Sequence, residues 1–200
     1  KHHSTNKSIF IIFLLIPLAA GALSALFTGN MSGSYASFTK PSFAPPGILF
    51  PIIWTILYLL MGVSSYIVAQ SDHPDKLLAL RTYFIQLFFN FMWSILFFGL
   101  SNYLLAFFWL LLLILLIIIM IVRFHKIKPI AAYLQIPYLF WCIFAAILNF
   151  AVYLLIKHFF CFSQLTHFEK YVILLDEKLQ ESEITMNKKD ILEIKRRFKK

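Results

Sequence analysis

The sequence predicts an all-α, polytopic membrane protein: a five-transmembrane-helix bundle followed by an amphipathic helical C-terminal tail. Hydrophobic residues make up 60 % of the 200 residues and charged residues only 14 %, which excludes an ordinary soluble domain. Charged side chains are also absent from four long intervals, each able to hold a span of roughly 20 apolar residues. These intervals are 8–39, 41–71, 82–122 and 129–156. We therefore divide the chain into a transmembrane domain, 1–158, and a charged tail, 159–200.

Five apolar spans follow one another along the first 158 residues. We expect them at roughly 8–27, 47–69, 78–98, 104–122 and 129–156. In the first span, small residues recur at a spacing of four, as Ala20/Ser24 and Gly21/Ala25. Small residues let helices approach closely in lipid, where van der Waals contact drives association. Pro17 is expected to kink this helix.

The second span is entered through a proline-rich stretch, Lys40 to Trp54, with the sequence KPSFAPPGILFPIIW. Proline is tolerated in the first turn of a helix because its missing N–H would have no partner there. Pro45, Pro46 and Gly47 therefore predict a rigid helix entry, with Trp54 about two turns inside. The preceding segment 28–46 has one charged residue, so we expect it to fold over the helix ends as a lid.

The later spans differ in their polar content. In the third, Gln86 and Asn90 lie one helical turn apart, with Trp93 three residues on. A tight turn over 99–103 leads to the fourth span, which is almost entirely Leu, Ile and Phe and is predicted to face lipid on all sides. In the fifth span Pro137 removes one backbone donor and is expected to bend the helix.

The tail has a different character. Apolar residues spaced by three and four predict an amphipathic helix from Leu165 onward, with capping-box spacing at Thr166 and Glu169. A second, basic helix is expected around 191–198. Two interpretations stay open: helices that rest on lipid headgroups, and a segment that binds a partner or forms a coiled coil.

The net charge of +9 arises outside the apolar intervals. A basic membrane protein meets anionic lipid headgroups, so membrane lipid is the expected partner and nucleic acid is not. The positive-inside rule places the N-terminus on the cytoplasmic side. The basic residues of that side would be Lys1, Lys7, Lys76, Arg81, Arg123, Lys126 and Lys128, against Lys40 and Lys157 close to the membrane on the other.

The spans hold no Asp, Glu or Lys, and Arg81 near one end is their only arginine. Proton-coupled pumps and conventional acid–base catalysis need such groups, so both classes are disfavoured. Two isolated cysteines predict no metal site. The remaining features are indoles and amides, and three tryptophans together with Ala145 and Tyr35 suit a flat aromatic ligand. The alternatives are packing or interfacial roles for the tryptophans, and interhelical hydrogen bonding for Asn90 and Asn149.

Three stretches resemble the signature blocks of the TspO/MBR family of tryptophan-rich sensory and translocator proteins. They are KPSFAPPGILFPIIWTILYLLMG, QLFFNFMWSILFFG and IPYLFWCIFAAILNF. The resemblance covers about 8–157. It implies five transmembrane helices, a pocket closed by the first loop and a homodimer. It also implies porphyrin or haem as ligand, with sterols and benzodiazepine-type compounds as others, and no obligatory cofactor or metal.

The same resemblance implies which residues bind. Trp54 and Trp141 match the tryptophans linked to light-dependent porphyrin breakdown, as candidate redox and stacking groups. The other matches to pocket-lining positions are Tyr35, Pro45, Asn90, Trp93, Ala145 and Leu148. Phe43 and Phe150 depart from the family pattern of Trp and Tyr. The implied function is tetrapyrrole binding for sensing, transport or light-dependent disposal. The alternatives are a passive carrier of sterols or other small hydrophobic molecules, and a scaffold whose tail recruits partners.

Overall fold

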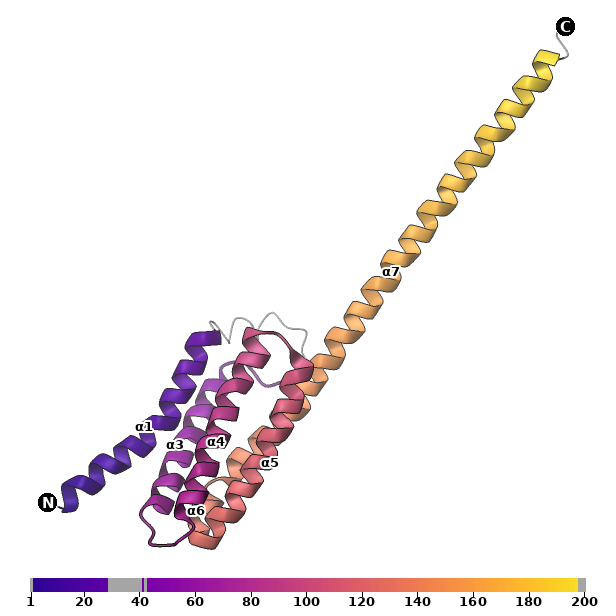
Figure 1. Ribbon diagram of the computed structural model, residues 1–200. Helices are drawn as coiled ribbons and strands as arrows, with labels where there is room; N and C mark the ends of the chain where they lie inside the picture. Colours follow the sequence, from indigo (N-terminus) through magenta and orange to yellow (C-terminus); the bar gives the residue numbers. More distant parts are fainter. Residues whose placement is uncertain (1, 29–40, 42, 198–200) are drawn as a thin grey trace. The chain divides into compact units, whose positions relative to one another are not determined.

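The structure is a computed structural model that describes residues 2–28, 41 and 43–197 (Figure 1). The described part contains helices and no strand. The helices are α1 (His2–Thr28), α3 (Leu49–Ala69), α4 (Lys76–Ser94), the π-helix η1 (Ile95–Gly99), α5 (Tyr103–Ile127), α6 (Pro129–Tyr133) and α7 (Ile136–Arg197). Five segments are long and apolar enough to cross a membrane: Lys7–Thr28, Leu49–Ala69, Lys76–Gly99, Tyr103–Ile127 and Pro129–His158. The predicted fold class and the five spans are confirmed.

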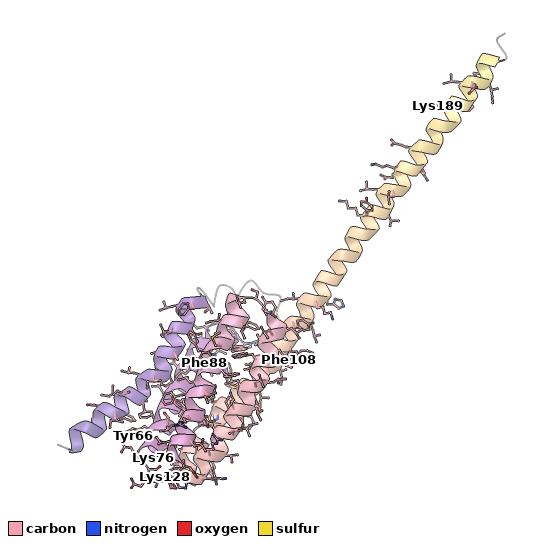
Figure 2. All side chains as sticks on the ribbon, in the orientation of Figure 1. Tyr66, Lys76, Phe88, Phe108, Lys128 and Lys189 are labelled. Atoms are coloured by element: carbon pink, nitrogen blue, oxygen red, sulfur yellow. The ribbon has the colours of Figure 1, made fainter. Side chains whose placement is uncertain are left out.

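The chain forms two compact units, Lys1–Leu155 and Ile156–Lys200. In the first unit α1 packs against α3 and α4, and α4 packs against α5, so that the helices run side by side as a bundle (Figure 1). Large apolar side chains cover the outside of this bundle; Phe88 and Phe108 are examples, each 56 % exposed (Figure 2). Such a surface matches a hydrocarbon environment and would be a liability in water.

Small residues set the distance between α1 and α3, as their spacing in α1 predicts. A Cβ added to Gly21 would lie 2.3 Å from the ring of Tyr58, and one added to Gly62 would lie 2.7 Å from the carbonyl oxygen of Phe13. Neither position has room for a side chain. Pro17 lies inside α1, which bends along its length (Figure 1).

The prediction that the fourth span faces lipid on all sides is wrong. One face of α5 is buried, at residues spaced by three or four: Ala106, Leu110, Leu113, Ile117, Met120, Phe124 and Ile127. The intervening residues Leu111, Leu112 and Leu115 are exposed. Composition could not distinguish the two faces because lipid and protein interior are equally apolar.

The fifth span is interrupted where proline predicts a bend. The short helix α6 begins at Pro129 and ends at Tyr133, and α7 begins at Ile136, directly before Pro137. The prediction of a helix start at Thr166 and of a separate helix over 191–198 is wrong, because α7 is continuous from Ile136 to Arg197. A capping sequence starts a helix only where the preceding chain is non-helical, and no Gly or Pro lies between 138 and 197.

Candidate ligand cavity

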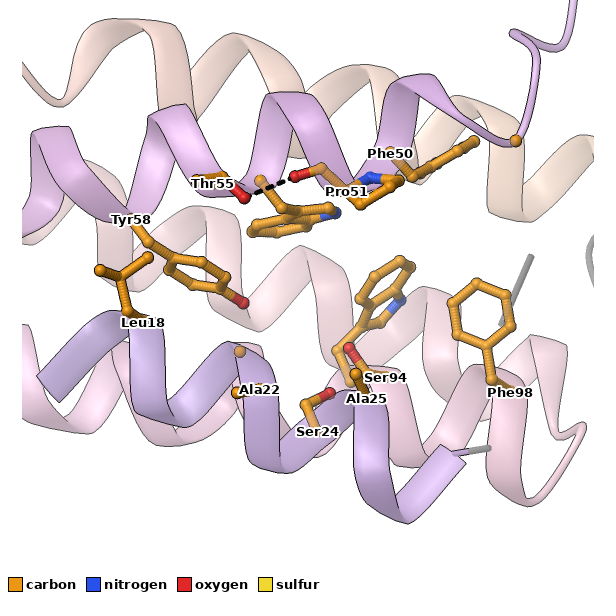
Figure 3. A pocket seen from close by; sticks show the side chains of 14 residues that line it. Leu18, Ala22, Ser24, Ala25, Phe50, Pro51, Thr55, Tyr58, Ser94 and Phe98 are labelled. Atoms are coloured by element: carbon orange, nitrogen blue, oxygen red, sulfur yellow. Dashed lines mark hydrogen bonds between the residues drawn. The ribbon is translucent and has the colours of Figure 1, made fainter. Parts of the chain in front are cut away.

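A cavity of about 480 Å³ lies within the bundle, between α1, the start of α3 and the end of α4 with η1 (Figure 3). Its volume falls within the range of roughly 300–1,000 Å³ typical of small-molecule sites. The described residues that line it are Leu18, Gly21, Ala22, Ser24, Ala25, Gly47, Phe50, Pro51, Trp54, Thr55, Tyr58, Trp93, Ser94 and Phe98. None of these is charged, so the cavity offers aromatic rings, small side chains and a few hydroxyls.

The prolyl entry of α3 supplies one wall. The N–H of Leu49 donates to the carbonyl of Pro46 at 3.0 Å, and the N–H of Phe50 donates to that of Gly47 at 3.3 Å. These turns start the helix so that residues 50, 51, 54, 55 and 58 share one side of its first turns. The Trp54 indole stacks on the ring of Tyr58, with centroids 5.4 Å apart and an interplanar angle of 29°.

The π-helix η1 shapes the opposite wall. The N–H of Leu100 donates to the carbonyl of Ile95 at 2.8 Å, a turn one residue wider than that of an α-helix. Phe98 from this turn and Ser94 just before it both lie at the cavity (Figure 3). The chain then turns through Ser101, whose φ is 51°, and Asn102 caps α5 by accepting from the N–H of Leu105 at 3.1 Å.

A chain of buried hydrogen bonds supports the cavity from α4 and α7. The Tyr58 hydroxyl donates to Asn90 Oδ1 at 2.9 Å, and Asn90 Nδ2 donates to the Tyr138 hydroxyl at 3.1 Å. Tyr138 in turn donates to Gln86 Oε1 at 2.9 Å. Asn90 is 1 % exposed and is not among the lining residues, so it acts on the cavity through Tyr58. This is the interhelical hydrogen bonding that the sequence left open as an alternative.

Trp93 both lines the cavity and makes an interhelical hydrogen bond. It lines the cavity, and its indole centroid lies 6.4 Å from that of Trp54. Its Nε1–H donates to Asn149 Oδ1 at 3.4 Å, while Asn149 Nδ2 donates to the carbonyl of Tyr103 at 2.8 Å. The ring is therefore held between α4 and α7 and presents one side to the cavity.

The structure does not bring Trp54 and Trp141 to the same cavity. Trp141 instead lines a shallow apolar groove between α3 and α7. The Phe50 ring, which lines the cavity, packs edge-on against Trp141 with centroids 5.7 Å apart. Phe50 therefore contacts Trp141 directly, while Trp141 itself is not among the described lining residues of the cavity.

The other predicted residues fall in three places. Ala145 and Leu148 are buried, each 5 % exposed, and lie outside the described lining. Pro45 is half-buried in the segment before α3. Tyr35 and most of the predicted lid lie outside the described residues.

Sequence reasoning missed the contribution of α1. Gly21, Ala22, Ser24 and Ala25 line the cavity together with Leu18, although the small size of the first four predicted only close helix packing. The same small side chains leave the space that the cavity fills. The run of small residues in α1 was the available signal, but the spacing of small residues does not distinguish a close helix contact from a cavity.

Fold and site together define a polytopic α-helical membrane protein with an uncharged, aromatic cavity inside its bundle. The TspO/MBR family model matches residues 13–155. The chain belongs to the TspO/MBR family.

Several known proteins are similar over the same part of the chain. The tryptophan-rich protein TspO of Archaeoglobus fulgidus is 42 % identical over 144 residues, covering 71 % of this chain and 93 % of that protein. Protein CrtK of Rhodobacter capsulatus is 32 % identical over 150 residues, covering 74 % and 92 %. The translocator protein of Bos taurus is 34 % identical over 145 residues, covering 70 % and 86 %.

Proposed function

We propose that this protein binds porphyrin- or haem-type tetrapyrroles in the cavity between α1, α3 and α4, for sensing, transport or light-dependent disposal. The observation that carries the proposal is the cluster of Trp54, Tyr58 and Trp93 on an uncharged cavity of about 480 Å³. Flat hydrophobic rings bind by offset stacking on aromatic side chains, supplemented by a few oriented hydrogen bonds.

Binding would depend on pre-organised rings. Tyr58 is fixed by its hydrogen bond to Asn90, and Trp54 stacks on Tyr58, so the aromatic wall needs little reordering when a ligand enters. The described lining has no acid, base or charged nucleophile. In any light-dependent disposal the excited ring and oxygen would therefore supply the oxidation, with Trp54 and Trp93 as the indoles that line the cavity.

Replacing Trp54 tests this proposal. We expect Trp54→Leu to weaken protoporphyrin IX binding by about tenfold, since a lost aromatic contact costs on the order of 1–2 kcal/mol. Trp141→Leu is the matched control, because Trp141 lies outside the described lining, and its affinity should stay within about twofold of wild type. Absorbance titration of purified protein measures both. Equal losses in the two variants would contradict the assignment of the cavity as the binding site.

A second candidate function is passive carriage of sterols or other small hydrophobic molecules. It is favoured by the similarity to a relative named translocator protein and by the apolar lining of the cavity. Flux of a labelled sterol between liposomes, measured beside equilibrium binding, separates a carrier from a receptor. Binding without flux would favour the tetrapyrrole receptor.

We also propose that the N-terminus lies on the cytoplasmic side. Lys76, the first residue of the third span, and Lys128, which follows the fourth, lie at the same end of the bundle (Figure 2). Lys7 is the first residue of the first span, and Arg123 and Lys126 lie near the end of the fourth span, close to Lys128. By the positive-inside rule this basic end is cytoplasmic.

A further inference from the structure

Among the described residues, two buried hydroxyls lack a hydrogen-bond partner, those of Ser24 and Tyr83, and of the two only Ser24 lines the cavity. Ser24 lies in α1, is 3 % exposed and lines the cavity, yet its Oγ has no hydrogen-bond partner among the described residues. Figure 3 shows this hydroxyl on the cavity side of α1, facing the α4 wall that carries Ser94.

Three Ser and Thr hydroxyls of α3 and α4 bond back to the preceding turn of their own helix, and that of Ser64 reaches the carbonyl of Ala131 in α6. Thr55 donates to the carbonyl of Pro51 at 2.7 Å, Ser65 to that of Met61 at 2.8 Å and Thr82 to that of Leu78 at 3.0 Å. Helical Ser and Thr adopt this arrangement because it satisfies the hydroxyl within its own helix. Ser24 does not adopt it, so its hydroxyl remains available to the cavity.

An unpaired hydroxyl is costly in this setting. Burial without a partner removes the bonds that water would make to the hydroxyl, and hydrocarbon offers no water to replace them. An alanine at 24 would avoid the cost and would fit among Ala22, Ala25 and Gly21. A ligand with an acceptor atom would also remove the cost, by accepting from Ser24 Oγ–H.

The position of Ser24 indicates which part of a ligand it meets. Ser24 is one helical turn from Thr28, where α1 ends, so it lies toward one membrane surface. A charged or strongly polar group costs less there than at the bilayer centre. The aromatic rings of Trp54 and Tyr58 extend from the same cavity toward the bundle interior.

We propose that Ser24 is a specificity-determining residue that donates a hydrogen bond to a carboxylate on the edge of a planar ring ligand, with the ring against Trp54. This inference rests on the proposed tetrapyrrole-binding function and adds an orientation to it. The polar edge of the ligand would point to the C-terminal end of α1, with Ser94 as a second hydroxyl across the cavity.

The test compares two porphyrins on Ser24→Ala. Protoporphyrin IX carries carboxylates, whereas octaethylporphyrin carries only alkyl groups. A hydrogen bond to a charged group contributes about 1.5–3 kcal/mol, so Ser24→Ala should bind protoporphyrin IX about tenfold or more weakly. Its affinity for octaethylporphyrin should stay within about twofold of wild type.

Ser65→Ala is the matched control, since Ser65 is a buried serine that lies outside the lining and bonds within its own helix. It should leave both affinities unchanged. The midpoint of thermal unfolding of ligand-free Ser24→Ala should equal or exceed that of wild type, because an unpaired hydroxyl has been removed.

The outcomes separate the two proposals. A Ser24→Ala variant that binds both porphyrins as wild type does, or loses affinity for both equally, would overturn the role of Ser24 and leave tetrapyrrole binding intact. Failure of wild-type protein to bind either porphyrin would overturn both.

Discussion

Gly62 of α3 faces the backbone of α1, where a Cβ would lie 2.7 Å from the carbonyl oxygen of Phe13 and 2.8 Å from the Cα of Leu14. Backbone atoms cannot rotate away as a side chain can, so Gly62→Ala should force α1 and α3 apart. We expect a loss of about 1–3 kcal/mol in the free energy of unfolding, typical of overpacking. Thermal unfolding in detergent micelles measures it.

Gly99 provides the control for Gly62. A Cβ at Gly99 would lie 3.6 Å from Ile95 Cγ2, an ordinary contact, so Gly99→Ala should be neutral within about 0.5 kcal/mol. Similar unfolding midpoints for the two variants would show that close approach at Gly62 does not limit the packing of α1.

At single residues, the site could be predicted in part. Trp54 and Trp93 were expected at the site and both line the cavity, because aromatic residues near polar ones stand out in an apolar sequence. Ser24 and Phe98 were not expected. Ser24 and Ser65 are both helical serines in apolar spans, and their sequence does not tell which hydroxyl has a partner. The place of Phe98 depends on a π-turn that the sequence does not signal.

At the scale of elements, the spans were predicted closely because charge and proline mark where they end. The third span was expected at 78–98 and is Lys76–Gly99, for example. Which face of a span packs inward was not predictable for α5, where Leu and Ile occupy both faces. In a soluble protein the exposed face of a helix is polar and the buried face is apolar, so the sequence shows which is which. In lipid both faces are apolar, and the sequence does not distinguish them.

Two adjacent leucines of α5 test its buried face. Leu113 is 0 % exposed and Leu112 is 50 % exposed, so Leu113→Ala and Leu112→Ala remove the same atoms from a buried and an exposed position. We expect Leu113→Ala to lower the free energy of unfolding by about 1–3 kcal/mol through lost packing contacts, and Leu112→Ala to change it by under about 0.5 kcal/mol. Detergent-to-SDS unfolding titrations would measure both; equal effects would argue against the assigned face.

At the scale of the whole molecule, one helix joins two units of different composition. The cavity and the hydrogen bonds from Tyr58 to Gln86 lie entirely within Lys1–Leu155, and the family match ends at residue 155. The unit Ile156–Lys200 shares the backbone of α7 and contributes no described residue to the cavity. Ligand binding should therefore be a property of the first unit.

Removing residues 160–200 tests this separation. The truncated chain keeps the whole of the fifth span, which ends at His158, and all described lining residues. We expect its affinity for protoporphyrin IX to stay within about twofold of full length, since no cavity contact is lost. Full-length protein with Trp54→Leu is the comparison, because it keeps the tail and loses a cavity ring. A truncated protein that folds, as shown by an unchanged thermal midpoint, yet binds porphyrin tenfold more weakly would assign the tail a part in the site. Unchanged affinity would instead indicate that the tail binds a partner or lipid. Cosedimentation of the full-length and truncated proteins with anionic vesicles would distinguish these two roles.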